Sequence, residues 1–147
     1  MVFIPGLKDI LLILYKNYKY MKVEQLRLKY VSLDYLLELS GGDADFILDM
    51  ILTFLNTAPG YMTDFELLRE QKDWYKMSRA AHKFKSSFSV IGSDSLTSYA
   101  AAIEKLCKEE VPDVAEMDRE IGEMKSLFLQ VMAELEDSVK KIKETEA

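Results

Sequence analysis

The sequence predicts an all-α protein: an antiparallel up-down-up-down four-helix bundle with one or two extra helices at its N-terminus. Apolar residues recur at steps of three and four over most of the 147 residues, which is the period of a helix with one buried face. Only three prolines and six glycines occur, and the alternation and hairpin turns of β-strands are absent from the pattern. Long amphipathic segments joined by short turns are typical of such a bundle.

Composition and charge exclude several classes of function. A chain of 147 residues is long enough for one domain with a full core. The net charge of −6 argues against a nucleic-acid-binding surface, because phosphate binding needs clustered lysine and arginine. The single cysteine, Cys107, excludes an intramolecular disulfide and favours a reducing, cytoplasmic location. We expect Cys107 to be a buried structural thiol.

Residues 1–30 are interpreted as an N-terminal helical extension or connector, and residues 31–147 as the bundle. The apolar run in the extension is bracketed by Lys8 and Lys16 and is much shorter than the ~20 residues of a membrane span. No basic region precedes it and no cleavage site of small residues follows, so we expect no signal peptide. We expect an extra amphipathic helix packed on the domain. A connector left from a longer protein and an alternative start at Met21 stay open.

The first elements of the bundle follow from apolar spacing and helix-end signals. A short helix is expected over 33–39, ended by the Ser-Gly-Gly that follows it. Asp43 is expected to cap a long helix over about 43–70. Local rules would break that helix at Pro59, but its apolar phase continues unchanged across the proline. We therefore expect one kinked helix in preference to two.

The next two helices are expected to fold back on each other almost without a loop. Asp73 starts a helix that runs to about Ile91. Gly92 suits the left-handed position after its end, and Ser93 can cap the following helix at once. The two helices must therefore pack side by side and antiparallel.

The last long helix begins with a clear start signal. Pro112 and Asp113, with Glu116 three residues on, form a capping box at its N-terminus. From there an apolar stripe runs from Met117 to Leu135, which gives the fourth helix of the bundle one buried face.

His82, the only histidine, is the residue that points to chemistry. The apolar seam of its helix is centred roughly 140° around the helix axis from His82, so the imidazole faces solvent. The seam consists of Trp74, Met77, Ala81, Phe84, Phe88 and Ile91. The neighbours of His82 on the outer face include no carboxylate and are Tyr75, Ser78, Arg79, Lys85, Ser86 and Ser89.

Several kinds of site are excluded by the motifs that the chain lacks. It has neither of the glycine-rich nucleotide-binding patterns. One histidine and one cysteine are too few for a zinc or bundle di-metal site, so we expect this chain to bind no metal. A catalytic triad would need a nucleophile beside the exposed His82. Acid pairs such as Glu109 and Glu110 fall on outer faces and are interpreted as solvating charges.

The remaining chemistry is His82 as a covalent nucleophile. A histidine ring ordinarily titrates near neutrality, so its unprotonated nitrogen can attack a phosphoryl group in line. Lys85, about 60° around the helix, could place its ammonium beside the new charge, a pairing worth ~0.5–1 kcal/mol at an exposed site. Ser86 and Ser89 are small and leave room for a partner, although serines are also ordinary on solvated faces. The hypothesis requires an exposed ring that no internal acidic group ties up.

This stretch resembles the signature of histidine-containing phosphotransfer (HPt) domains, H-x-x-K-[GS]-x-x-x-x-x-G after a small residue. The similarity extends over roughly Leu33 to Ile142 and includes Leu-Asp-Tyr-Leu at its start, Phe54 with Pro59, and Asp73-Trp74. Position 86 is more often glycine in the family. The residues on the signature positions are Ala81, His82, Lys85, Ser86 and Gly92.

The resemblance implies a phosphorelay intermediate. A receiver domain with an aspartyl phosphate would dock over His82, bring the magnesium ion, and pass the phosphoryl group to His82 for transfer to a second receiver aspartate. No cofactor bound by this chain and no autonomous ATP-dependent kinase activity are expected. The domain could stand alone or end a hybrid sensor kinase. Gly92 would be structural, and the docking surface would be bordered by Tyr75, Ser78, Arg79, Lys83, Ser86 and Ser89.

Three rival interpretations remain. The dimerisation bundle of a sensor kinase would want an acidic residue directly after the histidine and a proline shortly beyond, but Lys83 follows and no proline occurs between Pro59 and Pro112. A non-catalytic adaptor could bind a receiver without being phosphorylated. A structural oligomer would bury an exposed apolar face, for which the N-terminal segment is the best candidate.

Overall fold

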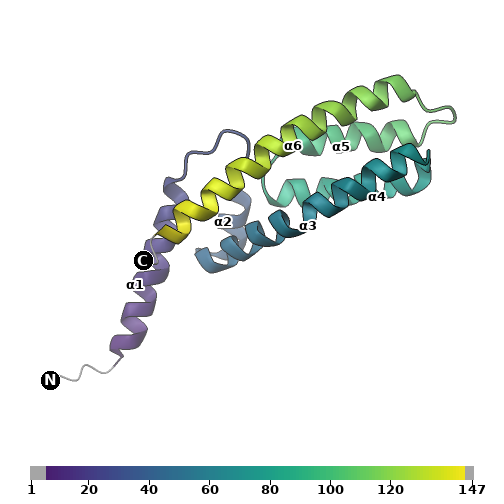
Figure 1. Cartoon of the computed structure of the whole chain (residues 1–147). Coiled ribbons are helices and arrows are strands. Elements are labelled where there is room, and N and C mark those ends of the chain that lie inside the picture. Colours follow the sequence, from purple (N-terminus) through teal and green to yellow (C-terminus); the bar gives the residue numbers. More distant parts are fainter. Residues whose placement is uncertain (1–5, 145–147) are drawn as a thin grey trace.

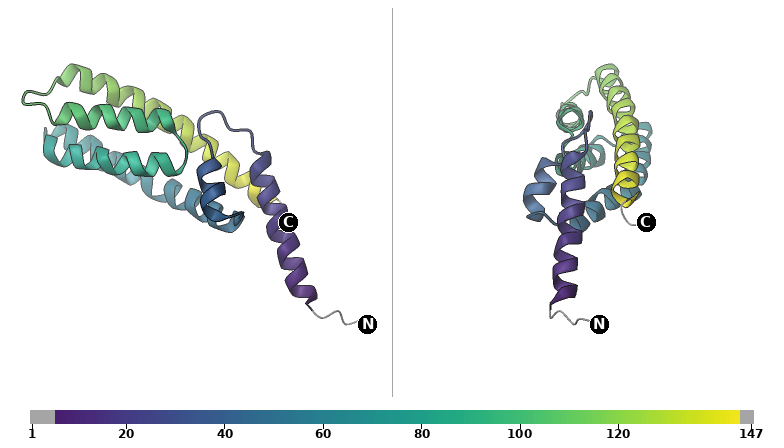
Figure 2. Two further views of the ribbon diagram at one scale, coloured as in Figure 1. Left: turned by 180° about the vertical axis from the view of Figure 1, so that it is seen from behind. Right: turned by 90° about the vertical axis from the view of Figure 1, so that its left-hand side faces the viewer.

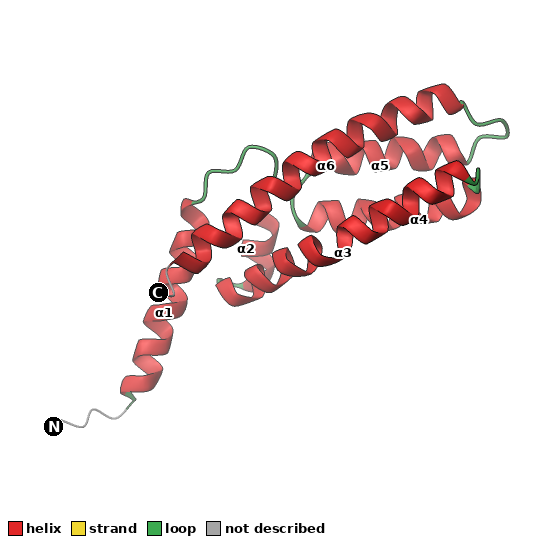
Figure 3. Ribbon diagram, in the orientation of Figure 1, coloured by secondary structure: helices red, strands yellow, loops and turns green. Residues whose placement is uncertain are grey.

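The computed structural model describes residues 6–144, and this part of the chain folds into six α-helices without a β-strand. Helices α3, α4, α5 and α6 run along a common direction as a bundle, whereas α1 projects from one end and the short α2 lies beside the bundle (Figures 1 to 3). The predicted four-helix bundle with extra N-terminal helices is confirmed. The bounds are α1 Leu7–Gln25, α2 Asp34–Ser40, α3 Ala44–Glu70, α4 Trp74–Val90, α5 Asp94–Cys107 and α6 Val114–Lys143.

Each bundle helix begins at a side-chain cap. The residue before the helix accepts a hydrogen bond from a backbone N–H two or three positions further on, which satisfies a donor that has no partner inside the helix. Caps at Asp43, Ser93 and Asp113 were expected from the sequence, whereas Asp73 was expected to be the first residue of its helix and is the cap before it. The caps are Asp43 for α3, Asp73 for α4, Ser93 for α5 and Asp113 for α6.

Helix α3 continues through Pro59, as the apolar phase predicted. Ala58 and Met62 on either side of the proline are buried in the core, while Pro59 itself lies on the exposed face. The backbone carbonyl that loses its partner to the proline ring can therefore be hydrated. Burial of the apolar face on both sides of Pro59 outweighs the local preference for a break.

A cluster of phenylalanines anchors α4 in the bundle. Phe84 and Phe88 of α4 stack with their ring centroids 5.1 Å apart, and Phe65 of α3 meets Phe84 edge-on at 5.5 Å. Phe54 of α3 and Phe128 of α6 pack around Phe88 with centroids 6.2–6.4 Å apart. Aromatic pairs at these separations add to the burial term. The apolar seam predicted for α4 is the face that packs here, so the opposite face is held outward.

The reversal between α4 and α5 depends on Gly92. Its φ of 76° lies in the left-handed region, which glycine adopts without the strain of a side chain. The loop before α2 also crosses close to it: the Ser32 N–H donates to the Gly92 carbonyl at 2.9 Å. A Cβ on Gly92 would lie 1.7 Å from the Ser32 carbonyl oxygen. The structural role expected for this glycine is therefore twofold.

One carboxylate on α6 holds the connection between α1 and α2. The Glu134 oxygens accept hydrogen bonds from three consecutive backbone N–H groups, those of Lys29, Tyr30 and Val31, at 2.7–3.2 Å. Charge-assisted bonds of this kind are stronger than neutral ones. The connection is therefore clamped to the last helix although it has no regular secondary structure.

Helix α1 packs on the bundle only near its C-terminal end. Its buried residues are Lys19 and Val23, and the Lys19 ammonium lies 2.9 Å from Asp45 of α3. Every residue of its first three turns, 7–18, is exposed. The expected helix is present, but most of its length does not pack on the domain. No helix within residues 6–144 is long and apolar enough to cross a membrane. The boundary between residues 30 and 31 stays a prediction.

Replacing Gly92 by alanine should destabilise the protein by more than about 1 kcal/mol. Alanine would be strained in the left-handed backbone conformation of this position, and its Cβ would collide with Ser32. Urea unfolding followed by circular dichroism measures the change. Gly122→Ala is the matched control: it lies inside α6 with open space around it, so alanine should stabilise the helix by about 0.5–1 kcal/mol. Equal effects of the two substitutions would contradict the role assigned to Gly92.

Candidate functional site

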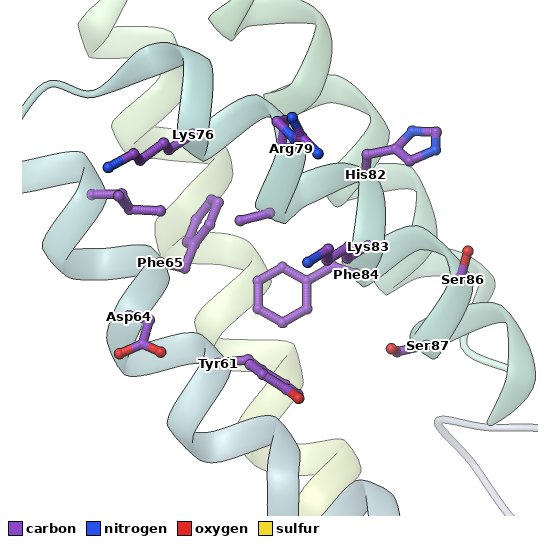
Figure 4. A pocket seen from close by; sticks show the side chains of 12 residues that line it. Tyr61, Asp64, Phe65, Lys76, Arg79, His82, Lys83, Phe84, Ser86 and Ser87 are labelled. Carbon is purple, nitrogen blue, oxygen red and sulfur yellow. The ribbon is translucent and has the colours of Figure 1, made fainter.

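His82 projects from the face of α4 that points away from the core. Its side chain is 66% exposed, and Figure 4 shows the ring standing clear of the helix while Phe65 and Phe84 line the groove between α3 and α4. The seam on the opposite side of α4, with Met77, Ala81 and Phe88 buried, fixes this orientation. The prediction that the imidazole faces solvent on a packed helix is confirmed.

A carboxylate from the next helix contacts the ring, which corrects the expectation that no acid lies near it. Glu104 of α5 places Oε1 2.9 Å from His82 Nδ1. The Glu104 side chain itself is buried, with 9% of its area exposed. The requirement that no internal acidic group engage the ring is therefore not met at Nδ1, and the contact involves this ring nitrogen alone. Nε2, on the far side of the ring, has no hydrogen-bond partner within residues 6–144.

Two lysines keep the buried carboxylate ionised. Lys85 Nζ lies 2.6 Å from Glu104 Oε2, and Lys108 Nζ lies 3.1 Å from Oε1. The hydrogen bond from Lys85 is the largest cause that lowers the pKa of Glu104 to about 2, and Lys108 and His82 lower it further. Burial alone would raise this pKa, because it disfavours the charged form. The carboxylate is therefore fully charged at neutral pH.

An ionised carboxylate determines which nitrogen of His82 carries the proton. It can only accept hydrogen bonds, so Nδ1 must be the donor. In the neutral ring the proton then resides on Nδ1, and the lone pair is on the exposed Nε2. The internal acid thus leaves the ring free to react at the nitrogen that faces solvent, and it orients the ring.

Lys85 does not point freely into the space where the sequence suggested it would meet an incoming phosphate. Its ammonium is committed to Glu104, and its side chain is only 31% exposed. Two ammonium groups share one carboxylate, however, so Lys85, Lys108 and Glu104 together carry one net positive charge. The charge beside His82 is therefore supplied by the triad as a unit and not by Lys85 alone.

Two grooves flank the ridge that carries His82. The groove between α3 and α4 encloses about 680 Å³, with Tyr61 and Asp64 on its α3 wall and Lys83 on its α4 wall (Figure 4). The second groove lies between α4 and α5 and is lined in part by Cys107. Burial, with a smaller contribution from Glu104, raises the pKa of the Cys107 thiol to about 11. The thiol is therefore protonated at neutral pH, and its expected burial is confirmed.

Most residues expected to border a docking surface lie on the open side of α4. Tyr75, Arg79, Lys83, Ser86 and Ser89 are all exposed. Tyr75 is 70% exposed and accepts a hydrogen bond of 3.2 Å from the Arg79 guanidinium, which also lies over its ring.

Ser78 is the exception among the expected docking residues. It is 7% exposed, because it lies on the flank of α4 that turns toward α5, so its expected position on the outer face is wrong. Ser89 is also partly engaged: its hydroxyl lies 3.4 Å from that of Thr97.

The face of α4 is basic although the whole chain is acidic. Between Trp74 and Val90 the helix contains no acidic residue, whereas the protein has a net charge of −6. A local positive potential attracts anionic groups and raises their rate of encounter. The surface around His82 therefore suits an acidic partner or a phosphoryl group. The basic residues of α4 are Lys76, Arg79, Lys83 and Lys85.

Glu104 is the functional candidate that sequence reasoning missed. A signal was present, because Glu104 lies on the same helical face as Ala100, Ile103 and Cys107, which are buried. An acid on an apolar seam needs a charged or hydrogen-bonding partner. The short turn after α4 also indicated the partner, because residues at similar distances from Gly92 lie level on the two antiparallel helices. His82 lies ten residues before Gly92, and Glu104 lies twelve residues after it.

Replacing Glu104 by Gln should lower the free energy of unfolding by about 1–2 kcal/mol at neutral pH. Because the pKa of Glu104 falls from 4.5 to about 2 on folding, its stabilisation is complete above pH 4.5 and is lost as the pH falls toward 2. The stability difference between wild type and variant should therefore shrink over that window. Urea unfolding of both proteins across the window measures it, and a difference that does not change with pH would contradict the assignment.

Comparison with known proteins agrees with this arrangement. The family model described as Hpt domain matches residues 49–144, well over half of the chain and all of α4 and α5. The comparisons with curated proteins and with solved structures gave no match. Members of the matched family carry out histidine phosphotransfer in two-component phosphorelays and interact with receiver domains. With a helical bundle of the same kind and a match of this length, the chain belongs to the Hpt domain family.

Proposed function

We propose that His82 is the phosphoryl acceptor of this domain, that it takes the group from an aspartyl phosphate on a receiver domain, and that it passes the group to an aspartate of another receiver. The observation that carries the proposal is the hydrogen bond of 2.9 Å between His82 Nδ1 and the buried Glu104, because it leaves the exposed Nε2 as the nucleophile. His82 is also the only histidine in the chain.

In the first transfer the Nε2 lone pair attacks phosphorus in line. The N–P bond forms as the P–O bond to the receiver aspartate breaks, and the electron pair of that bond leaves with the aspartate carboxylate. No proton needs to move, since Nδ1 keeps its own. Alignment and charge neutralisation are therefore the main requirements, and a ring held on a packed helix supplies the alignment.

Glu104 offsets the charge that the ring acquires. A ring that keeps its Nδ1 proton while it is phosphorylated on Nε2 is a cation, and the carboxylate accepts its hydrogen bond with opposite charge. Lys85 and Lys108 in turn hold Glu104 in place and leave positive charge near the phosphoryl oxygens. Lys85 is thus a positioning and charge-stabilising residue that acts through Glu104.

The second transfer reverses the first. A carboxylate oxygen of the second receiver attacks phosphorus, the N–P bond breaks, and its electron pair returns to Nε2. Because Nδ1 stays protonated throughout, the ring leaves as a neutral imidazole, which is a good leaving group. The same geometry therefore serves both directions, and the net direction depends on the receivers.

The magnesium ion of the transfer is proposed to come with the receiver. The groups around His82 support this, because the carboxylate beside the ring is already held by two ammonium groups and Mg²⁺ needs oxygen ligands. The exposed residues Tyr75, Arg79, Lys83, Ser86 and Ser89 are proposed to border the docked receiver. A cytoplasmic location and the lack of autonomous ATP-dependent kinase activity belong to the same proposal.

Replacing His82 by Gln should abolish phosphotransfer. The wild-type chain, mixed with a phosphorylated receiver and Mg²⁺, is expected to gain acid-labile, base-stable phosphate, and the variant none. The variant should unfold within about 0.5 kcal/mol of wild type, since the side chain is exposed. Label on the variant, or none on wild type with any cognate receiver, would exclude His82 as the acceptor. A variant that still binds the receiver and keeps the biological effect would favour the adaptor.

Replacing Glu104 by Gln should slow phosphotransfer about tenfold, since the loss of a charge-assisted hydrogen bond is worth on the order of 1.4 kcal/mol. The amide still accepts from Nδ1 but no longer balances the cationic ring. Rates measured at saturating receiver separate this effect from docking. Glu109→Gln removes an equal charge from an exposed position near the end of α5 and is the control. Equal rates for the two variants would show that net charge alone matters.

A further inference from the structure

The first three turns of α1 leave an apolar surface that the proposed phosphotransfer does not use. More than half of the large exposed apolar side chains in residues 6–144 lie on this one helix. Figure 2 shows α1 extending beyond the end of the bundle, so its first turns lie beyond the other helices of residues 6–144. Exposed apolar surface of this extent on one element indicates an interaction site.

Five of these side chains form a single seam along the helix. Their spacing alternates between four and three residues, which is the heptad pattern of a two-stranded coiled coil. In heptad terms Leu7, Leu14 and Met21 occupy d positions, and Leu11 and Tyr18 occupy a positions. Each of the five is between 43% and 59% exposed.

The seam faces away from the bundle. The residues of α1 that are buried against the domain, Lys19 and Val23, lie roughly 140° around the helix from the centre of the seam. A partner helix could therefore lie along the whole seam without displacing the contact between Lys19 and Asp45. The helix is fixed to the domain by one face and presents the other to solvent.

We propose that the seam is the dimer interface of this protein, and that its occupant is α1 of a second copy in parallel register. A heptad seam is complementary to another helix with the same spacing, and a second copy always provides one. The helix also gains from pairing, because short helices without tertiary contacts are only marginally stable in water. The interface is independent of the phosphotransfer proposal.

Charges beside the seam favour the parallel orientation. Lys8 and Lys22 both lie at e positions. In an antiparallel pair with the seam fully overlapped, Lys8 would approach the partner's Lys22, which is a repulsive contact. In a parallel pair the residue at g that faces Lys22 is the neutral Asn17, and Ile10 at the preceding g position adds apolar contact.

Dimerisation at α1 would leave the phosphotransfer surface open. In Figure 1, α1 projects from the end of the bundle opposite the turn between α3 and α4, and its first turns point away from α4 and α5. The grooves beside His82 are lined by residues of α3, α4 and α5 and by none of α1. A dimer of this kind would present two separate receiver sites.

The oligomeric state of the full chain tests the proposal. Sedimentation equilibrium at tens of micromolar should give twice the mass of one chain for wild type. The double variant Leu11→Glu with Leu14→Glu, which charges the seam, should give the mass of one chain. The control is Leu12→Glu with Ile13→Glu, which charges two equally exposed positions of the same helix outside the seam and should stay dimeric.

The orientation has its own test. Leu7→Cys on a Cys107→Ser background should form a disulfide-linked dimer on mild oxidation, because a parallel pair brings the two positions together at one d layer. Ile13→Cys on the same background should not, since position 13 points away from the seam. A dimer that fails to cross-link at position 7 would overturn the parallel arrangement.

Three results would overturn the dimer itself. Wild type could sediment as one chain at this concentration. The seam and control variants could dissociate equally, which would indicate a general apolar surface. Wild type could also bind lipid vesicles while it remains monomeric, which would assign the helix to a membrane surface. None of these results bears on phosphorylation of His82.

Discussion

The reversal at Gly92 is the constraint on which the proposed phosphotransfer site depends. Because the turn has almost no length, α4 and α5 run antiparallel from a common point, and residues equally far from it along the two helices lie level. Ten residues before the glycine is His82, and twelve after it is Glu104. The pairing of Nδ1 with the carboxylate follows from that register. A longer loop would let α5 slide along α4 and would separate the two groups.

The site combines an exposed imidazole, the proposed nucleophile, with a buried charge. Burying a carboxylate is costly unless it is paired, and Glu104 is paired with two ammonium groups and a ring nitrogen. In return the protein obtains a ring with one defined tautomer and one defined orientation on a surface that is otherwise open. The chain itself therefore needs few reactive groups, which agrees with the small number of motifs in its sequence.

Most of the fold could be predicted from the sequence, because helix ends and apolar faces are local signals. The sequence pattern predicted the caps at Asp43 and Asp113 and the continuity of α3 through Pro59. What could not be predicted depends on how two helices meet: the sequence shows which face of α5 is apolar, but the reach of Glu104 to His82 is set by tertiary packing. The commitment of Lys85 to Glu104 and the burial of Ser78 were missed for the same reason.

The hydrogen bonding of Glu134 to the connection before α2 has a further consequence. It acts on main-chain amides, so these hydrogen bonds do not depend on which side chains stand at positions 29 to 31, although Val31 is also buried in the core. Only proline, which lacks that hydrogen, would release one of the bonds. What lies upstream can therefore diverge in sequence, or be exchanged for another module, while the attachment point on α6 stays the same.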